Sequence, residues 1–367
     1  MIFNNKKYFA HLIAFLILAS CSTTSKNLFI NTNESNPRNY QKDIQEFYDY
    51  KNFFINDLKR IRDIIDSQKL SPSQLRDMKL LEKNYQKIFS KKKYQLELNP
   101  RQKYSKELIE LIYQLNLPID LSWDEKKQIM LPADLLSRQI EGFCASLYDD
   151  SISSINKEIN KIPNSTLVIY SPEYASLVNA LKSVNSKILL EQYHSSNFQE
   201  FAAEILGINF SKTRFNKVSN LNPNQKMGFT PRSRSDVSQV VVILEPGDIK
   251  AMIPALRYHG GKKFKYVNFI TSLEDLNDPL QLLDYEDSYT PVSNLISRRS
   301  KYDGSRSTEN FLEYGILGDW LLTQVLTQAN VQSAKINGAM GTIFYKSNSC
   351  AKRVISMQKI SPDLFSF

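Results

Sequence analysis

The sequence is poor in the residues that enzymes commonly place in active sites. Its 367 residues include only three histidines and eleven glycines. So few glycines count against a glycine-rich nucleotide-binding enzyme. No HExxH, CxxC, GxSxG or P-loop pattern occurs. After residue 20, no stretch is long and apolar enough to span a bilayer. We therefore expect a protein that is not an enzyme and that uses no metal or cofactor.

The remaining polar candidates for catalysis have simpler interpretations. His194-Ser195 follows a predicted strand end, where α/β sites form, but a Ser/His pair without an orienting base is more typical of a polar loop. His259, before Gly260-Gly261, is interpreted as a cation at a helix C-terminus, which the helix dipole favours. The acidic residues are too scattered to nominate a glycosidase pair. No catalytic residue is predicted.

The chain has a modest excess of positive charge. Its formal net charge is +9, and Lys6 and Lys7 lie in a leader without acidic residues, so the chain that follows carries +7. Such an excess could favour anionic glycans, lipid head groups or acidic proteins. A lysine-rich solvated surface is the simpler interpretation. We expect no nucleic-acid partner.

The first 21 residues have the pattern of a lipoprotein leader. A charged Asn4–Lys7 segment precedes an apolar run, Phe9–Leu18, that ends in the lipobox-like sequence Leu18-Ala19-Ser20-Cys21. We expect residues 1–20 to be a removed signal peptide. Cys21 would then carry a diacylglyceryl group and an acylated amino terminus, and several acyl chains give stable anchoring. An ordinary signal peptide with a chance cysteine is the alternative.

The residue after the lipobox cysteine bears on localisation. Ser22, rather than Asp, follows Cys21. This resembles enterobacterial lipoproteins that are sorted to the outer membrane, which implies a lipid-anchored protein on the periplasmic face of that membrane. The periplasm is oxidising, so the two remaining cysteines, Cys144 and Cys350, could form a disulfide. Two free buried cysteines are equally compatible with the sequence.

The sequence of residues 21–122 predicts a tether followed by helices. Residues 21–40 are rich in Ser, Thr and Asn, as in a flexible tether. Residues 41–122 show three amphipathic stripes, with start signals at Ser71-Pro72 and Asn99-Pro100 and an end at Leu117-Pro118. We predict a small all-α region, either an antiparallel bundle or a short helical-repeat stub. Its apolar stripes would form a core or a partner-binding groove.

Residues 123–367 alternate predicted strands with predicted helices, which indicates an α/β domain. The clearest strands are apolar runs typical of a parallel sheet buried on both faces: Thr166–Tyr170, Ile188–Tyr193, Gln239–Leu244 and Phe264–Ile270. The last two flank a helix and form a βαβ unit, for which we expect a right-handed crossover.

The other predicted elements of this domain are less regular. They are a short strand at Lys127–Leu131, one helix over about Leu135–Lys161, a helix cap at Asp248, a short helical face at Phe215 and Val218, a helix at Leu276–Leu283, a polar loop over Asp284–Gly304, a long helix at Phe311–Leu326, and a hairpin of Thr342–Tyr345 and Arg353–Met357.

Several motifs in this domain resemble one protein family in order and spacing. They are Phe229-Thr230-Pro231-Arg232-x-Arg234-x-Asp236-Val237, Tyr314-Gly315-x-Leu317-Gly318-Asp319-Trp320 and Ile336-Asn337-Gly338-Ala339-Met340-Gly341-Thr342-Ile343. Together they resemble the C-terminal domain of the LppC/LpoA family, from about Lys127 to the C-terminus. Members are outer-membrane lipoproteins that activate bifunctional penicillin-binding proteins, and this domain has the bilobed fold of type 1 periplasmic binding proteins.

The resemblance implies a reduced member of that family. Only one predicted helix separates Leu131 from Thr166, so the first lobe would be truncated, with the second lobe at about 165–300. The family's long N-terminal helical-repeat domain would be replaced by residues 41–122. The implied function is binding and activating a bifunctional penicillin-binding protein, which regulates peptidoglycan synthesis, with peptidoglycan as a further candidate partner. The alternative is a lipoprotein that binds a small molecule or wall fragment in the interlobe cleft.

Three charged residues lie at the entry to the buried strand at Gln239–Leu244. Arg232 and Arg234 could form a basic patch for an acidic partner surface or a glycan. They could instead brace Asp236 and nearby carbonyl groups, because polar groups at a strand entry need partners.

Overall fold

The computed structural model describes residues 58–67, 70–114, 117–127, 131–195, 197–221, 223, 226–274, 279–291 and 311–362. The predicted signal peptide, Cys21 and the predicted tether lie outside these residues.

A six-stranded sheet forms the centre of the described chain, in the order β11-β7-β6-β5-β3-β4. Five of its strands are parallel: β3 (Ser165–Tyr170), β4 (Ile188–Gln192), β5 (Val237–Ile243), β6 (Lys265–Asn268) and β7 (Ser288–Pro291). The edge strand β11 (Met357–Lys359) is antiparallel to β7. Counted along the chain, the parallel strands follow the order 2-1-3-4-5, one of the common doubly wound orders. The predicted α/β class is confirmed.

The central strand β5 is built from valine and isoleucine. Val240, Val241 and Val242 are fully buried and lie opposite Leu167, Val168 and Ile169 of β3. A strand covered on both faces excludes water from both sets of alternating side chains, so its sequence is continuously apolar. This continuous apolar run is what allowed β5 to be predicted from the sequence.

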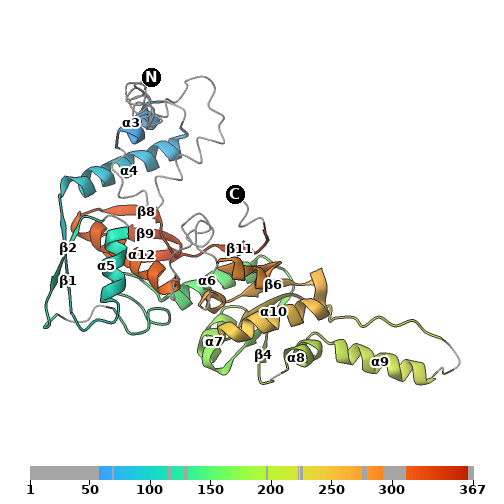
Figure 1. Ribbon diagram of the computed structural model, residues 1–367. Coiled ribbons are helices and arrows are strands. Elements are labelled where there is room, and N and C mark those ends of the chain that lie inside the picture. The colour runs from blue at the N-terminus through green and yellow to red at the C-terminus, as the bar shows by residue number, and fades with distance from the viewer. Residues whose placement is uncertain are drawn as a thin grey trace, which may run out of the picture. The chain divides into compact units, whose positions relative to one another are not determined.

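Helices cover both faces of this sheet (Figure 1). They are α6 (Leu147–Asn160), α7 (Ala175–Ser183), α8 (Phe198–Ile205), α9 (Ile208–Leu221) and α10 (Pro246–Gly260), with 3-10 turns η1 (Pro172–Tyr174), η2 (Gly261–Lys263), η3 (Ile270–Leu273) and η4 (Pro279–Tyr285). The strands β4 and β6 lie on opposite sides of the β3–β5 pair, so right-handed crossovers place α7 and α10 on opposite faces. The chain from β4 to β5 crosses in the same direction as α10, and α8 packs against α10 accordingly.

Three predictions near these helices need correction. The helix predicted from Leu135 begins at Leu147, because Ser146 caps it in a capping box with Asp149. Asp248 lies in the first turn of α10, whose N-cap is Glu245. Lys127 and Leu131 lie in bends rather than in a strand, and residues 128–130 are outside the described chain.

The strand β7 lies inside the segment that the sequence predicts as a polar loop. Its Ser288 and Thr290 are fully buried and accept hydrogen bonds from the side-chain amide of Asn268 on β6, at 2.8 and 3.0 Å. The strand is therefore joined to its neighbour by polar side chains, which hydrophobicity cannot reveal. Residues 292–304 of the predicted loop are outside the described chain, as is the start of the helix predicted at Leu276.

The region before the α/β domain contains helices and two strands. The helices are α3 (Leu58–Asp66), α4 (Pro72–Ser90) and α5 (Ser105–Gln114); the strands β1 (Tyr94–Leu98) and β2 (Ile119–Trp123) form a parallel pair. The capping box at Ser71 is present, with Pro72 in the first turn. The prediction of an all-α region is wrong at the two strands, because β1 alternates buried and exposed residues over only five positions.

A small antiparallel sheet completes the described chain. The strands β8 (Ser333–Asn337), β9 (Thr342–Lys346) and β10 (Ser349–Val354) form it, after the helix α12 (Phe311–Gln328). The predicted final hairpin is present as β9–β10, but its second strand starts at Ser349 rather than Arg353. The strand β8 was not predicted. The side-chain amide of Asn84 on α4 donates to the Ser333 carbonyl at 2.9 Å and joins the helical region to this sheet.

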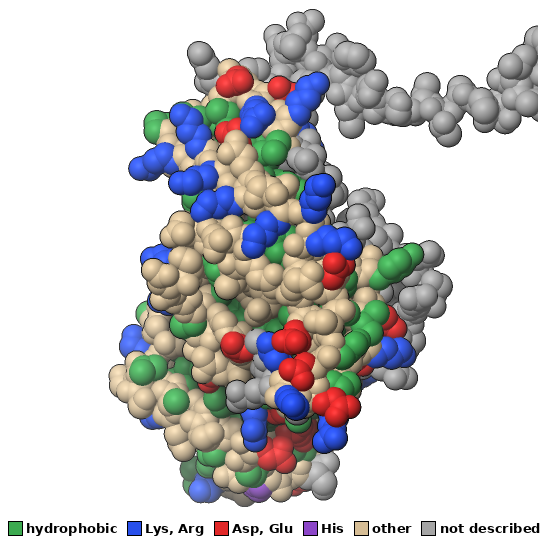
Figure 2. Space-filling model, turned by 90° about the vertical axis from the view of Figure 1, so that its left-hand side faces the viewer, with side chains coloured by type: hydrophobic (Ala, Val, Ile, Leu, Met, Phe, Trp, Pro, Cys, Tyr) green, Lys and Arg blue, Asp and Glu red, His purple; other side chains and the backbone are tan. Residues whose placement is uncertain are grey.

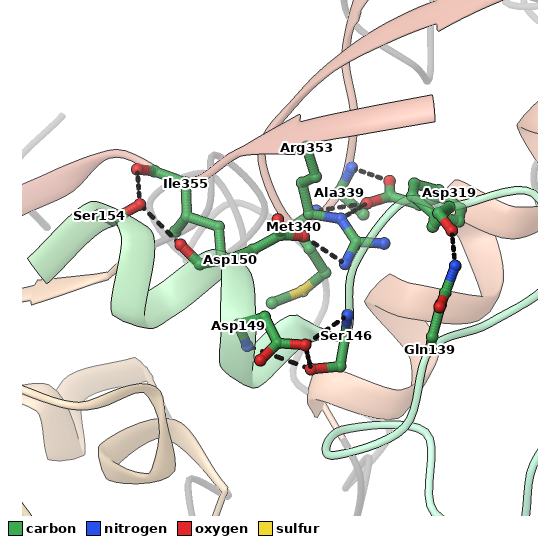
Figure 3. Close-up of polar contacts among 11 residues, drawn as sticks. Gln139, Ser146, Asp149, Asp150, Ser154, Asp319, Ala339, Met340, Arg353 and Ile355 are labelled. Atoms are coloured by element: carbon green, nitrogen blue, oxygen red, sulfur yellow. Dashed lines mark hydrogen bonds and ion pairs between the residues drawn. The ribbon is translucent and has the colours of Figure 1, made fainter. Parts of the chain in front are cut away.

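A buried ionic cluster connects α12, the β8–β9 turn, β10 and α6 (Figure 3). The Asp319 carboxylate on α12 accepts hydrogen bonds from the backbone N–H groups of Ala339 at 2.5 Å and Met340 at 3.1 Å. The Arg353 guanidinium lies 3.4 Å from Asp319 and 3.5 Å from Asp150, with its own side chain only 1% exposed. Asp319 is fully buried, so these contacts replace its lost water.

The turn around Asp319 explains why the residue at position 338 is glycine. A Cβ at Gly338 would lie 2.5 Å from a carboxylate oxygen of Asp319, closer than side chains pack. The turn can therefore approach the carboxylate only without a side chain at this position. Two of the motifs quoted from the sequence thus meet in space and form one structural unit.

A disulfide between Cys144 and Cys350 lies next to this cluster. The backbone N–H of Cys144 donates to the Ala351 carbonyl at 3.0 Å, and the N–H of Ala351 donates to the Gly142 carbonyl at 2.7 Å. The Phe143 ring packs under the Arg353 guanidinium at 4.3 Å, a cation–π contact. The segment that precedes α6 is thereby fastened to β10.

The cluster predicts an unusual pH dependence of stability. Burial raises the pKa of Asp150 to about 7 and that of Asp319 to about 6, against the opposing effect of Arg353. Between about pH 4 and 7 the folded chain therefore binds more protons than the unfolded chain, so this contribution to stability falls as the pH rises. We expect the Tm to fall from about pH 5 to about pH 8, and Asp150→Asn to flatten that slope.

The measurement is thermal unfolding followed by circular dichroism across that pH range. One such carboxyl changes the unfolding free energy by at most about 1.4 kcal/mol per pH unit. Asp120→Asn, which removes an exposed partner of Lys93, is the control and should retain the wild-type slope. An Asp150→Asn variant with an unchanged slope would contradict the assignment.

Candidate functional site

A groove of about 870 Å³ lies beside the end of β4, between α8, α9 and the segment 228–236, which we call the strap. Apolar and charged side chains alternate around it. The apolar ones are Phe201, Ile205, Phe210, Phe215, Val218 and Phe229; the charged ones are Glu191, Glu204, Arg214, Arg232, Arg234 and Asp236. All three charged residues singled out at the strand entry therefore line this groove.

The helix α9 forms one wall of the groove and buries little of its own surface. Gly207 turns the chain between α8 and α9 with a φ of +76°, which favours glycine. Ile208 is the only residue of α9 that is buried, whereas Phe210 is 77% exposed and Leu221 is 82% exposed. Large apolar side chains left in water on one helix are typical of an interaction surface.

The strap is held against α9 and α8 by aromatic and backbone contacts. Phe229 stacks on Phe215 of α9 with ring centroids 4.3 Å apart. The backbone N–H of Arg232 donates to the Ser211 hydroxyl at 3.1 Å. The Lys263 ammonium donates to the carbonyls of Ser233 at 2.9 Å and Arg234 at 2.5 Å.

Arg234 and Asp236 make the contacts of a structural brace. The Arg234 guanidinium donates to both carboxylate oxygens of Asp236, at 2.8 and 2.6 Å, and to the Ile205 carbonyl at 3.2 Å. These hydrogen bonds from Arg234 lower the pKa of Asp236, and the Asp236 carboxylate in turn raises the pKa of Arg234. The pair locks the strap to the end of α8.

Arg232 is placed differently from Arg234. Its side chain is exposed and forms no ion pair with any residue in the described part of the chain, and the same holds for Arg214 on α9. From residue 208 to residue 235 the sequence has six Lys and Arg and no Asp or Glu. The groove lining itself has three cations and three anions: Arg234 pairs with Asp236, Arg214 and Arg232 lie on the side of α9 and the strap, and Glu191 and Glu204 lie on the side of β4 and α8.

Sequence reasoning found the strap but missed the groove. It predicted only a short helical face at Phe215 and Val218, because α9 has no continuous apolar stripe facing a core. Two signals could have identified it: the absence of acidic residues over residues 208–235, and large apolar residues placed among lysines there.

The two histidines of the α/β domain have no catalytic neighbours among the described residues. His194 lines the groove, with its Nδ1 2.8 Å from the Gln192 carbonyl and its ring against the edge of Phe201. The Nε2 of His259 lies 3.1 Å from the Gln199 carbonyl, in the last turn of α10. Neither ring meets a carboxylate that could orient it as a base.

A second polar cluster lies at the carboxyl ends of β3 and β5, and we call it the carboxyl-end cluster. The Tyr148 hydroxyl donates to Glu274 at 2.8 Å, and Tyr148, Tyr174 and Phe269 pack edge to face. Glu245 lies beside Glu173 and Tyr174, and burial together with Glu173 raises its pKa. In doubly wound sheets, ligands bind at this edge where the strand order reverses, here between β3 and β5.

The described residues offer neither a metal site nor a membrane-spanning helix. Within the described residues, no group of three or more His, Cys, Asp or Glu could hold a metal ion. None of the helices in the described ranges has the length and apolarity to cross a bilayer.

Comparisons with known proteins give distant structural likenesses. No protein-family model matches the chain, and no curated protein matches it. LpoA of Haemophilus influenzae is similar over 90% of this chain and 56% of its own, with 13% identity and a TM-score of 0.38. An ABC transporter substrate-binding protein from Desulfitobacterium hafniense, in complex with Leu, is similar over 73% of this chain and 98% of its own, with 10% identity and a TM-score of 0.39. This chain thus spans little more than half of the Haemophilus protein.

The two strap arginines should respond differently to substitution. Arg234→Ala leaves Asp236 and the Ile205 carbonyl without their donor, so we expect a loss of about 1–2 kcal/mol in the free energy of unfolding. Arg232→Ala removes an exposed, unpaired side chain and should change it by less than about 0.5 kcal/mol. Urea denaturation of both variants measures this; equal effects would contradict the bracing role.

Proposed function

We propose that this protein is an outer-membrane lipoprotein that binds and activates a bifunctional penicillin-binding protein and so regulates peptidoglycan synthesis. The proposal joins the lipobox at Cys21 to the LppC/LpoA-like motifs of the α/β domain. It places the activity in binding rather than in bond chemistry.

The observation that carries the proposal is the groove formed by α8, α9 and the strap. It combines exposed aromatic residues such as Phe210 with two cations, Arg214 and Arg232, that form no ion pair within the described ranges. Aromatic and arginine side chains are the usual anchors of protein interfaces. We infer that this groove contacts the synthase through a segment of the synthase that is acidic and partly apolar.

Activation requires more than contact. A bound activator raises the activity of an enzyme only if it binds the active conformation more tightly than the inactive one. The rigid part of the groove, fixed by the Arg234–Asp236 pair, would give that preference by fitting one conformation of the synthase. Peptidoglycan is a further partner that the same basic surface could touch.

The lipid anchor would confine this contact to one side of the wall. Acyl groups on Cys21 would hold the protein on the periplasmic face of the outer membrane, so it would meet a synthase of the inner membrane only across the peptidoglycan.

The test is binding and activation in purified components. We expect the protein to recover a bifunctional periplasmic synthase in a pull-down and to raise its rates of strand polymerisation and cross-linking. The triple variant Lys212→Glu, Arg214→Glu, Arg232→Glu should weaken that binding about tenfold or more, because it reverses these two cations of the groove, Arg214 and Arg232, and the neighbouring Lys212 of α9. The matched control, Lys126→Glu, Lys346→Glu, Lys352→Glu, has the same charge change at exposed positions elsewhere.

The outcomes separate the function from the site. Failure to recover any synthase, with unchanged synthase rates, would overturn the proposed function. Equal binding by the triple variant and its control would retain the function but exclude the groove.

A second candidate function is supported by the carboxyl-end cluster. Neighbouring carboxyls at Glu173 and Glu245 lie at the edge of the sheet where doubly wound proteins bind ligands. Their charge favours a small molecule or wall fragment with an amino group. In that case the protein would be a receptor lipoprotein.

Thermal shift measurements distinguish this second function. Amino acids and amino-bearing wall fragments at about 100 times their Kd would stabilise the protein by roughly 2.7 kcal/mol, a rise in Tm of several degrees. Glu245→Gln should lose that rise, and Glu204→Gln, at the groove, should keep it. No shift with any of these compounds would reject the receptor function.

A further inference from the structure

The positive charge of the protein is concentrated in one short part of the chain. Residues 59–107 contain fourteen Lys and Arg against six Asp and Glu, a net charge of +8. Residues 108–367 contain 27 of each kind, a net charge of zero. The excess seen in the overall composition therefore belongs to α3, α4, β1 and the start of α5.

Within this part, one set of cations follows a single helix face. Arg76, Lys79 and Lys83 recur at helical spacing along α4 and are exposed, and Lys92 follows just after the helix. We call these four residues the basic face. Figure 2 shows Lys and Arg side chains gathered with few Asp and Glu over the upper part of the molecule, at the height of α3 and α4 in Figure 1.

Within the described residues, the basic face has no acidic partner. Nearby cations do have acidic partners: Arg62 pairs with Glu82 at 2.7 Å and Lys93 with Asp120 at 2.9 Å. The four residues of the basic face form no ion pair with any residue that the structure describes. Their charges are therefore available to an outside partner.

The arrangement fits an extended anionic surface better than a protein partner. Arg76, Lys79 and Lys83 span about 11 Å along α4, and Lys92 lies beyond its C-terminal end. The same face offers only Leu80, 38% exposed, as an apolar anchor. Protein interfaces depend on buried aromatic or arginine anchors in pockets. A row of exposed, flexible cations instead matches the diffuse negative potential of a membrane with anionic lipids.

The position of this region in the sequence supports the same partner. Lys59 follows the predicted lipidation site, Cys21, by 38 residues. The predicted tether, residues 21–40, would as a flexible chain have a root-mean-square span of about 25 Å. A lipid anchor at Cys21 would therefore keep the basic face at high effective concentration near the bilayer.

We propose that the basic face binds an anionic phospholipid surface. This surface is separate from the groove and orients the protein on the membrane that carries its anchor. The attraction is electrostatic, so it does not require the anchor itself and weakens as salt screens the charges.

The test uses the chain from residue 21 onward with Cys21→Ser, so that no acyl group contributes. It is sedimented with vesicles of phosphatidylcholine alone and with vesicles in which about a third of the lipid is phosphatidylglycerol. We expect binding only to the second kind, with a loss of about tenfold between low and roughly 0.5 M salt.

The deciding variant reverses the basic face: Arg76→Glu, Lys79→Glu, Lys83→Glu, Lys92→Glu. We expect it to reduce vesicle binding about tenfold or more. The control, Lys126→Glu, Lys262→Glu, Lys346→Glu, Lys352→Glu, has the same change in net charge at exposed positions and should bind nearly as the parent does. If reversal disturbs folding, judged by circular dichroism, the four glutamine substitutions replace it.

Three results would overturn the proposal: no binding to anionic vesicles, equal loss in the reversed variant and its control, or dependence of peptidoglycan binding rather than vesicle binding on the basic face. Because no synthase is present, failure here leaves the proposed activation of a synthase unaffected, and failure of that activation leaves this result unaffected.

Discussion

The interaction on which much of the structure depends is the burial of Arg353 between two carboxylates. Its guanidinium faces Asp319 on α12 and Asp150 on α6, and it covers the ring of Phe143. Removing one partner from such a buried group typically costs roughly 3–5 kcal/mol, because the remaining charge has no water. The contacts therefore fix a helix, a turn and a strand from distant parts of the sequence in one arrangement. Two carboxylates share this one cation, and burial raises the pKa of both, that of Asp150 to about 7.

The sequence was sufficient where structure is set by local pattern. The strand β5 was predicted from a continuous apolar run, and the helix α10 from apolar residues at helical spacing. The buried members of these sets are Val240–Ile243 in β5 and Ile249, Met252, Ile253 and Leu256 in α10. The sequence was insufficient where an element is stabilised by residues far away along the chain. The strand β7 is held by hydrogen bonds from Asn268 on β6, and β1 pairs with β2, which follows it only after a helix. The same limit applied to the candidate site. Arg234 and Asp236 were found as neighbours, but the contact with Ile205 and the exposed face of α9 depend on the fold.

The positive charge is distributed unevenly along the sequence. A body with equal numbers of acidic and basic residues has no long-range preference for an anionic partner, so its contacts must depend on local surfaces such as the groove. Residues 59–107, with a net charge of +8, have the opposite property. They attract anions over a distance of about one Debye length, roughly 8 Å at physiological salt. Composition alone, a net +9, could not distinguish a uniformly basic protein from this arrangement.

The two arginines of the strap differ in whether their charge is balanced within the described chain. Arg234 gives its hydrogen bonds to Asp236 and Ile205, so its charge is balanced within the protein and serves the shape of the strap. Arg232, two residues earlier, has an exposed side chain that faces the groove without an acidic partner in the described chain. A strand entry needs one arginine to satisfy its polar groups, and the second is then free to meet another molecule. The bracing and binding interpretations of this motif therefore apply to different residues within it.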